Sequence, residues 1–394
     1  MDALITPSNW QKVKLGDIFF ITAGGDLSKP HYSNTKQSNF NYPIYSNAIE
    51  KKGLYGYSSF FIIKNKSITI TARGTMGVAF FRDYPYVPIG RLLVLQPKIS
   101  NIDCRFYTEY INSKVKFNTE QTTIPQLTIP KVALCKIPLP PLNEQIAIAN
   151  ILSDVDRYLY SLDALILKKE SVKKALSFEL LSQRKRLKGF NQAWQRVRLG
   201  DIGITISGLA GKTKQDFING NAKYITFLNV LNNVIIDTSI LENVKIYPNE
   251  KQNSFKKYDL FFNTSSETPK EVGMCAVLLD DIDQVFLNSF CFGFRIFDKA
   301  VDSLFLSYLI NSEIGRKAFE NLAQGSTRYN LSKSGFNNVC LILPSLNEQR
   351  AIANILSDLD SEIISLKNKK RQFENIKKAL NHDLMSAKIR VLNK

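Results

Sequence analysis

The sequence predicts an α+β protein in which two globular, mostly-β domains are joined by two long helices. These helices are expected to form an antiparallel coiled coil, and the whole chain to be an internal pseudo-twofold repeat. Residues 143–156 recur at 347–360 with 12 of 14 positions identical. The nonapeptide that begins at Trp10 recurs at Trp194, and these are the only two tryptophans. Two echoes in the two halves of the chain indicate two copies of one structural unit.

The repeated motifs also set the expected domain boundaries. The offset between copies is 184 residues at the opening motif and 204 at the closing motif, so the second copy is longer by 20 residues. We expect a first domain over residues 1–142, a first helix over 143–189, a second domain over 190–346 and a second helix over 347–394. The sequences between the echoes are almost unrelated, which suggests two similar scaffolds that recognise two different things.

The first domain is expected to consist mainly of strands and turns. Segments 68–71 and 92–95 are short, apolar or β-branched, and bounded by Gly, Pro and Asn. A shorter helix is expected near residues 106–116. Prolines at 138, 140 and 141 favour an extended approach to the first long helix.

Each long helix carries an apolar seam with heptad spacing. Asn143 is a suitable N-cap, Glu144 suits the first turn, and the first helix is expected to end near Arg186, with Gly189 as its stop. A length of about 40 residues corresponds to roughly 60 Å. Because a domain separates the helices, the second can return antiparallel to the first and bury both seams. The seam residues are Ile148, Leu152, Val155, Leu159, Leu162 and Ile166, then Ile352, Leu356, Leu359, Ile363, Leu366, Phe373, Leu380 and Leu384.

The net charge points to a polyanionic partner. Lys and Arg number 52 against 35 Asp and Glu, a formal charge of +17. Residues 1–190 contain 26 basic and 14 acidic side chains, and residues 191–394 contain 26 and 21. Such an excess favours nucleic acid, although a lysine-rich solvated surface is the alternative.

Motifs for chemistry are missing. The only histidines, His31 and His382, lie in unrelated contexts without a triad or metal pattern. A phosphate loop at 208–213 would need glycine where the chain has Ile206. We find no methyltransferase tetrad, glycine-rich AdoMet loop or nuclease cluster, so the chain is interpreted as a binder without catalytic, cofactor-binding or metal-binding residues.

Other features bear on the compartment and on the surface of the helices. Five scattered cysteines without C-x-x-C spacing favour a reducing compartment. We find neither a signal peptide nor a membrane-length apolar run, so a cytoplasmic protein is expected. Carboxylates on the helices are interpreted as a solvated or partner-facing stripe: Asp154, Asp156, Asp163, Asp358, Asp360 and Glu362.

Candidate DNA contacts lie in the divergent, turn-rich inserts. Arg can bond guanine bidentately, Asn and Gln can bond adenine, and Lys, Ser and Thr suit phosphates. The polar loop at 121–127 aligns with 325–331 by the 204 offset, which strengthens both. The candidates are Lys29, His31, Tyr32, Lys36, Arg73, Thr75, Arg91, Thr122 and Gln126 in the first copy, and Lys212, Lys214, Ser326, Arg328, Tyr329 and Asn330 in the second.

These motifs together resemble the specificity subunit of a type I restriction-modification system. The resemblance rests on Leu-Pro-Pro-Leu-Asn-Glu-Gln at 139–145, on Leu-Pro-Ser-Leu-Asn-Glu-Gln at 343–349, and on the opening Trp-x-x-Val-x-Leu-Gly-Asp-Ile of each copy. Segments 42–47 and 71–77 also resemble family strand-loop segments. Ser345 departs from the proline of the first copy. The resemblance covers the whole chain.

The resemblance implies a non-catalytic role. Each target recognition domain would read one half of a bipartite, asymmetric site in double-stranded DNA, and the helices would set the spacer between halves. Two modification (methyltransferase) subunits would dock on the helices, and restriction (nuclease-translocase) subunits would join them. AdoMet, Mg and ATP would be bound by those partner subunits and not by this chain.

Three alternatives remain open from sequence. One is a specificity subunit that serves a fused nuclease-methyltransferase. Another is a self-sufficient nuclease or methyltransferase, which the missing motifs disfavour. The last is a coiled-coil scaffold with generic polyanion binding, which random-sequence DNA would occupy as well as a specific target.

Overall fold

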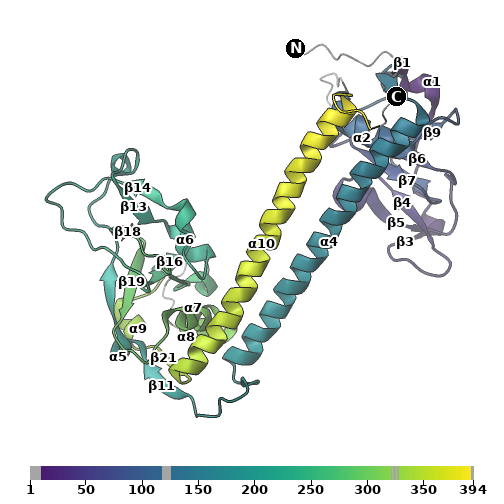
Figure 1. The fold of residues 1–394 in the computed structure, drawn as a ribbon. Coiled ribbons are helices and arrows are strands. Elements are labelled where there is room, and N and C mark those ends of the chain that lie inside the picture. The colour runs from purple at the N-terminus through teal and green to yellow at the C-terminus, as the bar shows by residue number, and fades with distance from the viewer. Residues whose placement is uncertain (1–9, 118–125, 321, 323–324, 326–327, 392–394) are drawn as a thin grey trace. The chain divides into compact units, whose positions relative to one another are not determined.

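A computed structural model describes the chain except residues 1–9, 118–125, 321, 323–324, 326–327 and 392–394. The chain divides into two compact units (Figure 1). The first unit comprises Met1–Ala164 and Asn368–Lys394, and the second comprises Leu165–Lys367. Each long helix therefore contributes one part to each unit.

The first unit has an antiparallel sheet covered by a helix. The sheet consists, in order, of β2 (Phe19–Ala23), β9 (Leu93–Pro97), β6 (Ser67–Ile70) and β7 (Ala79–Arg82). All four residues of β6 are buried, which identifies it as a central strand. Helix α2 (Cys104–Lys114) lies against β6 and β7, with Phe106, Tyr107 and Ile111 fully buried. Asp103 caps α2 by accepting hydrogen bonds from the amides of Arg105 and Phe106.

A second, mixed sheet completes the first domain. It consists, in order, of β3 (Tyr32–Ser33), β5 (Leu54–Ser58), β4 (Tyr42–Tyr45) and β8 (Val87–Pro88). The β4–β8 pair is parallel and the other pairs are antiparallel. The remaining short helices are α1 (Leu15–Ile18), η1 (Lys29–His31), η2 (Glu50–Gly53) and α3 (Ile129–Ala133).

The second unit repeats this plan. Its antiparallel sheet consists, in order, of β12 (Gly203–Ser207), β19 (Cys291–Ile296), β15 (Leu260–Asn263) and β17 (Cys275–Val277). Helix α7 (Ser303–Asn311) lies against β17. A smaller sheet consists of β14 (Glu242–Val244), β13 (Ala222–Ile225) and β18 (Val285–Leu287), and β13–β18 is its parallel pair. The same strand order and one parallel pair in each unit support a common scaffold.

The second unit also contains several shorter elements. They are α5 (Leu199–Ile202), η3 (Lys214–Phe217), α6 (Phe227–Asn232), η4 (Thr238–Ile240), β16 (Ser265–Ser266), η5 (Pro269–Glu271), α8 (Glu313–Glu320), β20 (Tyr329–Asn330) and α9 (Lys333–Asn337).

In both units, the strand of the opening motif pairs with the strand that leads into the closing motif. Strand β1 (Gln11–Lys14) pairs antiparallel with β10 (Lys136–Leu139), which leads into the first long helix. Strand β11 (Gln195–Arg198) pairs in the same way with β21 (Cys340–Leu343). The opening motif and the closing motif thus build one joint between a domain and its helix. This explains why both motifs recur while the sequence between them does not.

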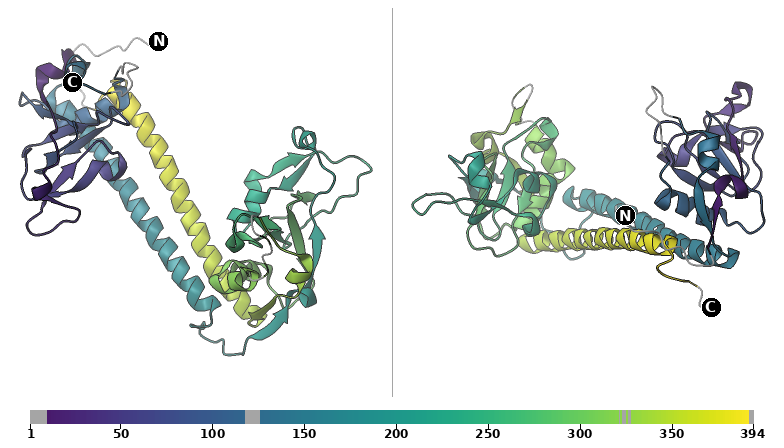
Figure 2. Two further views of the ribbon diagram at one scale, coloured as in Figure 1. Left: turned by 180° about the vertical axis from the view of Figure 1, so that it is seen from behind. Right: turned by 90° about the horizontal axis from the view of Figure 1, so that it is seen from above.

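Helices α4 (Leu142–Leu181) and α10 (Leu346–Met385) contain 40 residues each and pack antiparallel (Figures 1 and 2). Every seam residue is buried or half-buried. The predicted architecture of two β-rich domains and two long antiparallel helices is confirmed. Two details of the prediction were wrong. Helix α4 begins at Leu142, so Asn143 lies in its first turn and is not its N-cap, and α4 ends at Leu181, before a left-handed Gln183 (φ 62°), not near Arg186.

The ends of the seams are also part of the domain cores. Ile148 and Leu152 are buried in the core of the first unit, together with Leu384 from the last turn of α10. Ile352 and Leu356 occupy the matching place in the second unit. Within the described parts of the chain, no helix has the length and apolarity needed to cross a membrane.

Candidate nucleic-acid interface

Two of the predicted contacts in the first unit lie together. Arg73 is exposed in the turn after β6, and its Nη2 donates to Oε1 of Gln126 at 3.3 Å. The next residue, Leu127, donates its backbone amide to the carbonyl of Ala72 at 2.9 Å. Gln126 and Leu127 are therefore fastened to the turn that follows the central strand.

Asn47 joins this turn to the turn that carries Arg91. Its Oδ1 accepts from the Ala72 amide at 2.7 Å, and its Nδ2 donates to the Gly90 carbonyl at 2.6 Å. Arg91 is exposed in left-handed backbone (φ 68°), and its amide donates to Gly24. We define Arg73, Arg91 and Gln126 as the first edge. Thr75 is exposed in the same turn, where its carbonyl accepts from the Thr71 hydroxyl at 2.6 Å.

The second unit places its own candidates at the matching position. Leu331, the counterpart of Leu127 at an offset of 204, donates its amide to the carbonyl of Thr264 after the central strand β15, at 2.8 Å. Strand β20 pairs with β16, so that Asn330 faces Ser265. We define Arg328, Tyr329 and Asn330 as the second edge. Leu127 and Leu331, at the ends of the two segments aligned in the sequence, therefore occupy equivalent places.

Arg328 is supported more firmly than Arg73. Its Nε donates to Oγ of Ser265 at 3.1 Å, and its guanidinium carbon lies 5.5 Å from the ring centre of Phe290. Phe290 is itself exposed, so this pair forms a cationic surface backed by an aromatic ring. Nothing in the sequence relates Phe290 to Arg328, and sequence reasoning did not find it.

A second group of first-unit candidates lies at the other end of the mixed sheet. Tyr32 pairs with Ser58, whereas Asn47 follows the end of β4 that pairs with Leu54. His31 contacts Ser59 through Nδ1 at 2.7 Å and lies edge-on to the ring of Phe60. Lys29 and Lys36 are exposed nearby in the chain. The structure thus divides the first-unit candidates into the first edge and this separate group.

The two second-unit lysines differ in their surroundings. The Lys212 side chain is only 5% exposed, and its Nζ lies 2.5 Å from Oε2 of Glu250 and 2.6 Å from the Lys245 carbonyl. The hydrogen bond from Lys212 is the main reason why the pKa of Glu250 falls to about 2. Lys212 is therefore committed to an internal ion pair, while Lys214 is exposed in η3. Thr122 and Ser326 lie outside the described residues.

The repeated Asn-Glu-Gln motif fastens each domain to its helix through the glutamine. Gln145 accepts from the Asp103 amide at 2.9 Å and donates to the carbonyls of Asn101 and Pro140. Gln349 accepts from the Asp302 amide at 2.8 Å and donates to the carbonyls of Ala300 and Pro344. Both glutamines are fully buried. Buried polar groups need hydrogen-bond partners, and here backbone groups provide them.

The glutamate of each motif forms an ion pair with an arginine that follows the C-terminal end of the other long helix. Glu144, at the start of α4, pairs with Arg390, which follows α10. Glu348, at the start of α10, pairs with Arg186, which follows α4, at 2.7 Å for both oxygens. The two glutamates are 3% and 1% exposed, and both pairs obey the 204 offset. Trp10 also donates to Glu144, at 3.1 Å.

Cross-helix ion pairs account for much of the carboxylate stripe. Asp156 pairs with Lys377 in the first unit, and its counterpart Asp360 pairs with Lys173 in the second. Asp163 and Glu362 are likewise paired, with Lys370 and Lys169. Asp154 and Asp358 are exposed and do not contact the opposite helix through any ion pair in the described residues.

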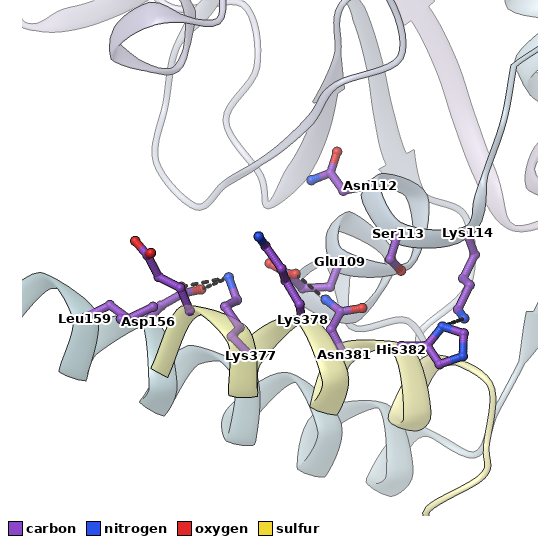
Figure 3. A pocket seen from close by; sticks show the side chains of 11 residues that line it. Glu109, Asn112, Ser113, Lys114, Asp156, Leu159, Lys377, Lys378, Asn381 and His382 are labelled. Carbon is purple, nitrogen blue, oxygen red and sulfur yellow. Dashed lines mark hydrogen bonds and ion pairs between the residues drawn. The ribbon is translucent and has the colours of Figure 1, made fainter. Parts of the chain in front are cut away.

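A groove of about 730 Å³ runs beside α2 in the first unit (Figure 3). Glu109 faces it from α2 and accepts from Nδ2 of Asn381 at 2.9 Å. Burial raises the pKa of the Glu109 carboxyl, and nearby Asp156 adds to this rise. The second unit has Tyr308 at the matching position of α7, and its hydroxyl donates to Asp360 at 2.7 Å. The charges in the groove are mixed, and no ligand chemistry stands out.

Among the residues that the structure describes, no group of three or more His, Cys, Asp or Glu side chains converges to hold a metal ion. The surface that the candidates support is therefore one of hydrogen-bond donors, guanidinium groups and one backing aromatic ring. Such groups recognise phosphates and base edges.

Comparison with known proteins gives consistent matches. Residues 7–169 and 191–375 match the family described as type I restriction modification DNA specificity domain. The MjaVIII specificity subunit of Methanocaldococcus jannaschii is 27% identical, over 100% of this chain and 96% of its own length. The crystal structure of the type I system S subunit from M. genitalium matches with a TM-score of 0.64 at 18% identity, covering 96% and 97% of the two chains. A chain from a structure of type I complex assembly matches with a TM-score of 0.51 at 14% identity.

Proposed function

Since this chain belongs to the type I restriction-modification DNA specificity family and is a non-catalytic specificity subunit, we propose that its two domains read two halves of one bipartite, asymmetric DNA target. The observation that supports this most strongly is the equivalence of the two edges. Gln126 and Asn330 precede the two leucines that bond to the turn after the central strand, and an exposed arginine lies beside each turn, Arg73 within the first and Arg328 bonded to Ser265 in the second. Different side chains at an equivalent place are what two different half-sites require.

The chemistry of the edges suits duplex DNA. An arginine has a planar fork of donors that matches O6 and N7 of guanine, and glutamine or asparagine can match N6 and N7 of adenine. Exposed lysines outside the edges, such as Lys36 and Lys214, would hold phosphates and set the register. A formal charge of +17 adds a salt-dependent attraction to the whole duplex.

The two long helices are suited to the role of a spacer. Each has 40 residues, and each begins at a joint fastened by a buried glutamine and a buried Glu–Arg pair. We assign residues 1–142 and 190–346 to target recognition and 143–189 and 347–394 to the spacer. Two recognition domains on such a spacer would set the number of unread base pairs between the half-sites.

The catalytic functions would belong to partner subunits. Two modification subunits would bind AdoMet and methylate adenine, and restriction subunits would use ATP and Mg for cleavage and translocation. A repeated spacer suits this arrangement, because two identical partners need the same surface twice.

Adenine methylation mapped across a genome tests the proposal. A host that carries the chain and its modification subunit is compared with the same host after deletion of the specificity gene alone. We expect N6-methyladenine in a single bipartite, asymmetric sequence, and its complete loss after the deletion. An unchanged methylation map, or methylation without sequence preference by the purified complex, would contradict a recognition role.

A further inference from the structure

Both units contain a hollow lined by the aspartate that caps the domain helix, Asp103 in the first unit and Asp302 in the second. In the first unit, Arg105 lies in this hollow. It pairs with Asp103 at 2.7 Å and donates through Nη1 to Oδ1 of Asn150 on α4 at 2.8 Å. The Arg105 side chain is 35% exposed, so a partner can reach it.

The second unit builds the same arrangement. Arg350 lies 3.8 Å from the carboxylate of Asp302, which caps α7 as Asp103 caps α2. Asn354, the counterpart of Asn150, lines the same hollow as Arg350 and Asp302. Arg350 is 60% exposed. Asparagine, aspartate and guanidinium therefore meet in both units.

The two arginines do not come from matching positions. Arg105 is on the domain helix α2, and its counterpart on α7 is Leu304. Arg350 is on the long helix α10, and its counterpart on α4 is Ile146. The guanidinium is thus present at the same place although the residue that supplies it differs. A shared ancestor sequence explains the repeated Asn but does not explain two independently placed arginines.

One turn further along each helix lies a repeated aspartate. Asp154 and Asp358 are exposed and identical, whereas the next repeated aspartates, Asp156 and Asp360, form ion pairs across the helices. Among the described residues, the one ion pair of Asp154 is with Arg157, which is itself 79% exposed, and Asp358 forms none. Intrachain packing therefore gives no reason for these two carboxylates to match.

We propose that Arg105, Asn150 and Asp154 in the first unit, and Arg350, Asn354 and Asp358 in the second, form two copies of one docking surface for two copies of the same protein. We call it the repeated docking surface. The partner would present a carboxylate to the arginine and a lysine or arginine to the aspartate. This inference rests on the proposed function, under which the partner is the modification subunit.

Stoichiometry measured by native mass spectrometry tests the surface. The full chain is mixed with its modification subunit, and the wild type is expected to bind two copies. Asp154→Lys with Arg105→Ala should leave one high-affinity site, and Asp358→Lys with Arg350→Ala should leave the other. Each altered site should weaken about tenfold or more. The four changes together should abolish the complex, and Arg371→Ala, exposed on α10 where the repeat has Leu167, should still bind two.

The outcomes separate the two proposals. A wild-type chain that binds no modification subunit would remove the partner assignment of the proposed function. A wild type and a quadruple variant that both bind two copies would overturn the repeated docking surface alone. Circular dichroism and binding of target DNA by each variant check that the fold is intact. All the altered side chains lie outside the hydrophobic cores, so a folded quadruple variant is expected.

Discussion

At the scale of single residues, the two edges differ in how firmly their arginines are held. Arg73 has one weak hydrogen bond, to Gln126 at 3.3 Å, whereas Arg328 is bonded to Ser265 and backed by the ring of Phe290. A side chain that is already oriented loses less conformational entropy on binding. The second edge is therefore better preorganised than the first.

Substitution of these arginines is expected to affect one half-site at a time. Arg73→Ala should weaken binding to targets with an intact first half-site by about 1–3 kcal/mol, and Arg328→Ala should do so for the second half-site. Competition binding with targets altered in one half or the other gives the measurement. Lys36→Ala, which changes an exposed charge outside the edges, is the matched control. An equal loss on every DNA sequence would mean that the arginines contact phosphate instead.

Glu109 is expected to make the first unit less stable as pH rises. Burial raises the pKa of its carboxyl above that of the unfolded chain, so the folded state binds the proton more tightly. The stability contribution is complete below the unfolded pKa and is lost as pH rises through the folded pKa. Glu109→Gln should therefore raise the melting temperature near neutral pH and flatten its dependence on pH. Each kcal/mol corresponds to about 2–4 °C in a unit of this size.

Melting curves of the wild type and Glu109→Gln between acidic and neutral pH give the comparison. Glu109→Tyr provides a second variant, because it copies Tyr308, whose hydroxyl donates to Asp360 in the second unit. If the melting temperatures of Glu109→Gln and wild type differed by the same amount at every pH, titration of this carboxyl would not be the cause.

At the scale of elements, the joints explain the most specific part of the sequence. The seam and the repeated motifs predicted the helices, their length and their direction, because apolar spacing and local repetition are encoded in nearby residues. The joints were not predicted. Gln145 bonds to Asn101 and Asp103, more than 40 positions away. Such a partner cannot be found by spacing along the chain.

The candidate site shows the same limit. The 204 offset identified Leu127 and Leu331 as counterparts, and each of them donates its amide to the turn after a central strand. Lys212 was selected as a basic residue in a turn, but its charge is taken up by Glu250, which lies 38 positions away. Phe290 behind Arg328 was missed for the same reason. Composition identifies which side chains can bind DNA, and tertiary contacts decide which of them are available.

At each joint the buried glutamate pairs with an arginine of the other copy, and removal of this arginine should lower the free energy of unfolding. Arg186→Ala leaves Glu348 almost fully buried without its bidentate partner. We expect a loss of about 1–3 kcal/mol, less than for a fully buried pair because Arg186 is 27% exposed. Denaturant unfolding measures it, and a double-mutant cycle with Glu348→Gln gives the coupling. Arg198→Ala, from the exposed pair with Asp201, should leave the free energy of unfolding almost unchanged. Equal effects of the two alanine variants would contradict the role of the buried joint.

At the scale of the whole molecule, the larger excess of basic residues lies in the first copy and the longer insert lies in the second. Residues 1–190 carry most of the basic excess, with 26 basic and 14 acidic side chains, while the second copy has the additional 20 residues. Phosphate neutralisation scales with the number of basic contacts. The first copy is therefore suited to supply more of the non-specific attraction, and the second more of the shaped surface.

The spacer role predicts that the gap in the target follows helix length. Removal of one heptad from each helix, residues 161–167 and 365–371, keeps the apolar seam in phase and leaves both joints unchanged. Seven residues correspond to about 10 Å of helix, close to the rise of three base pairs at about 3.4 Å each. The methylated sequence of the shortened chain should keep both half-sites and lose about three base pairs between them.

Removal of four residues from α4 alone puts its seam out of register and should abolish methylation. If the shortened chain stays active with an unchanged gap, then something other than the helices measures the distance. Because the half-sites serve as an internal control in the same DNA, this result could not be attributed to damaged recognition domains.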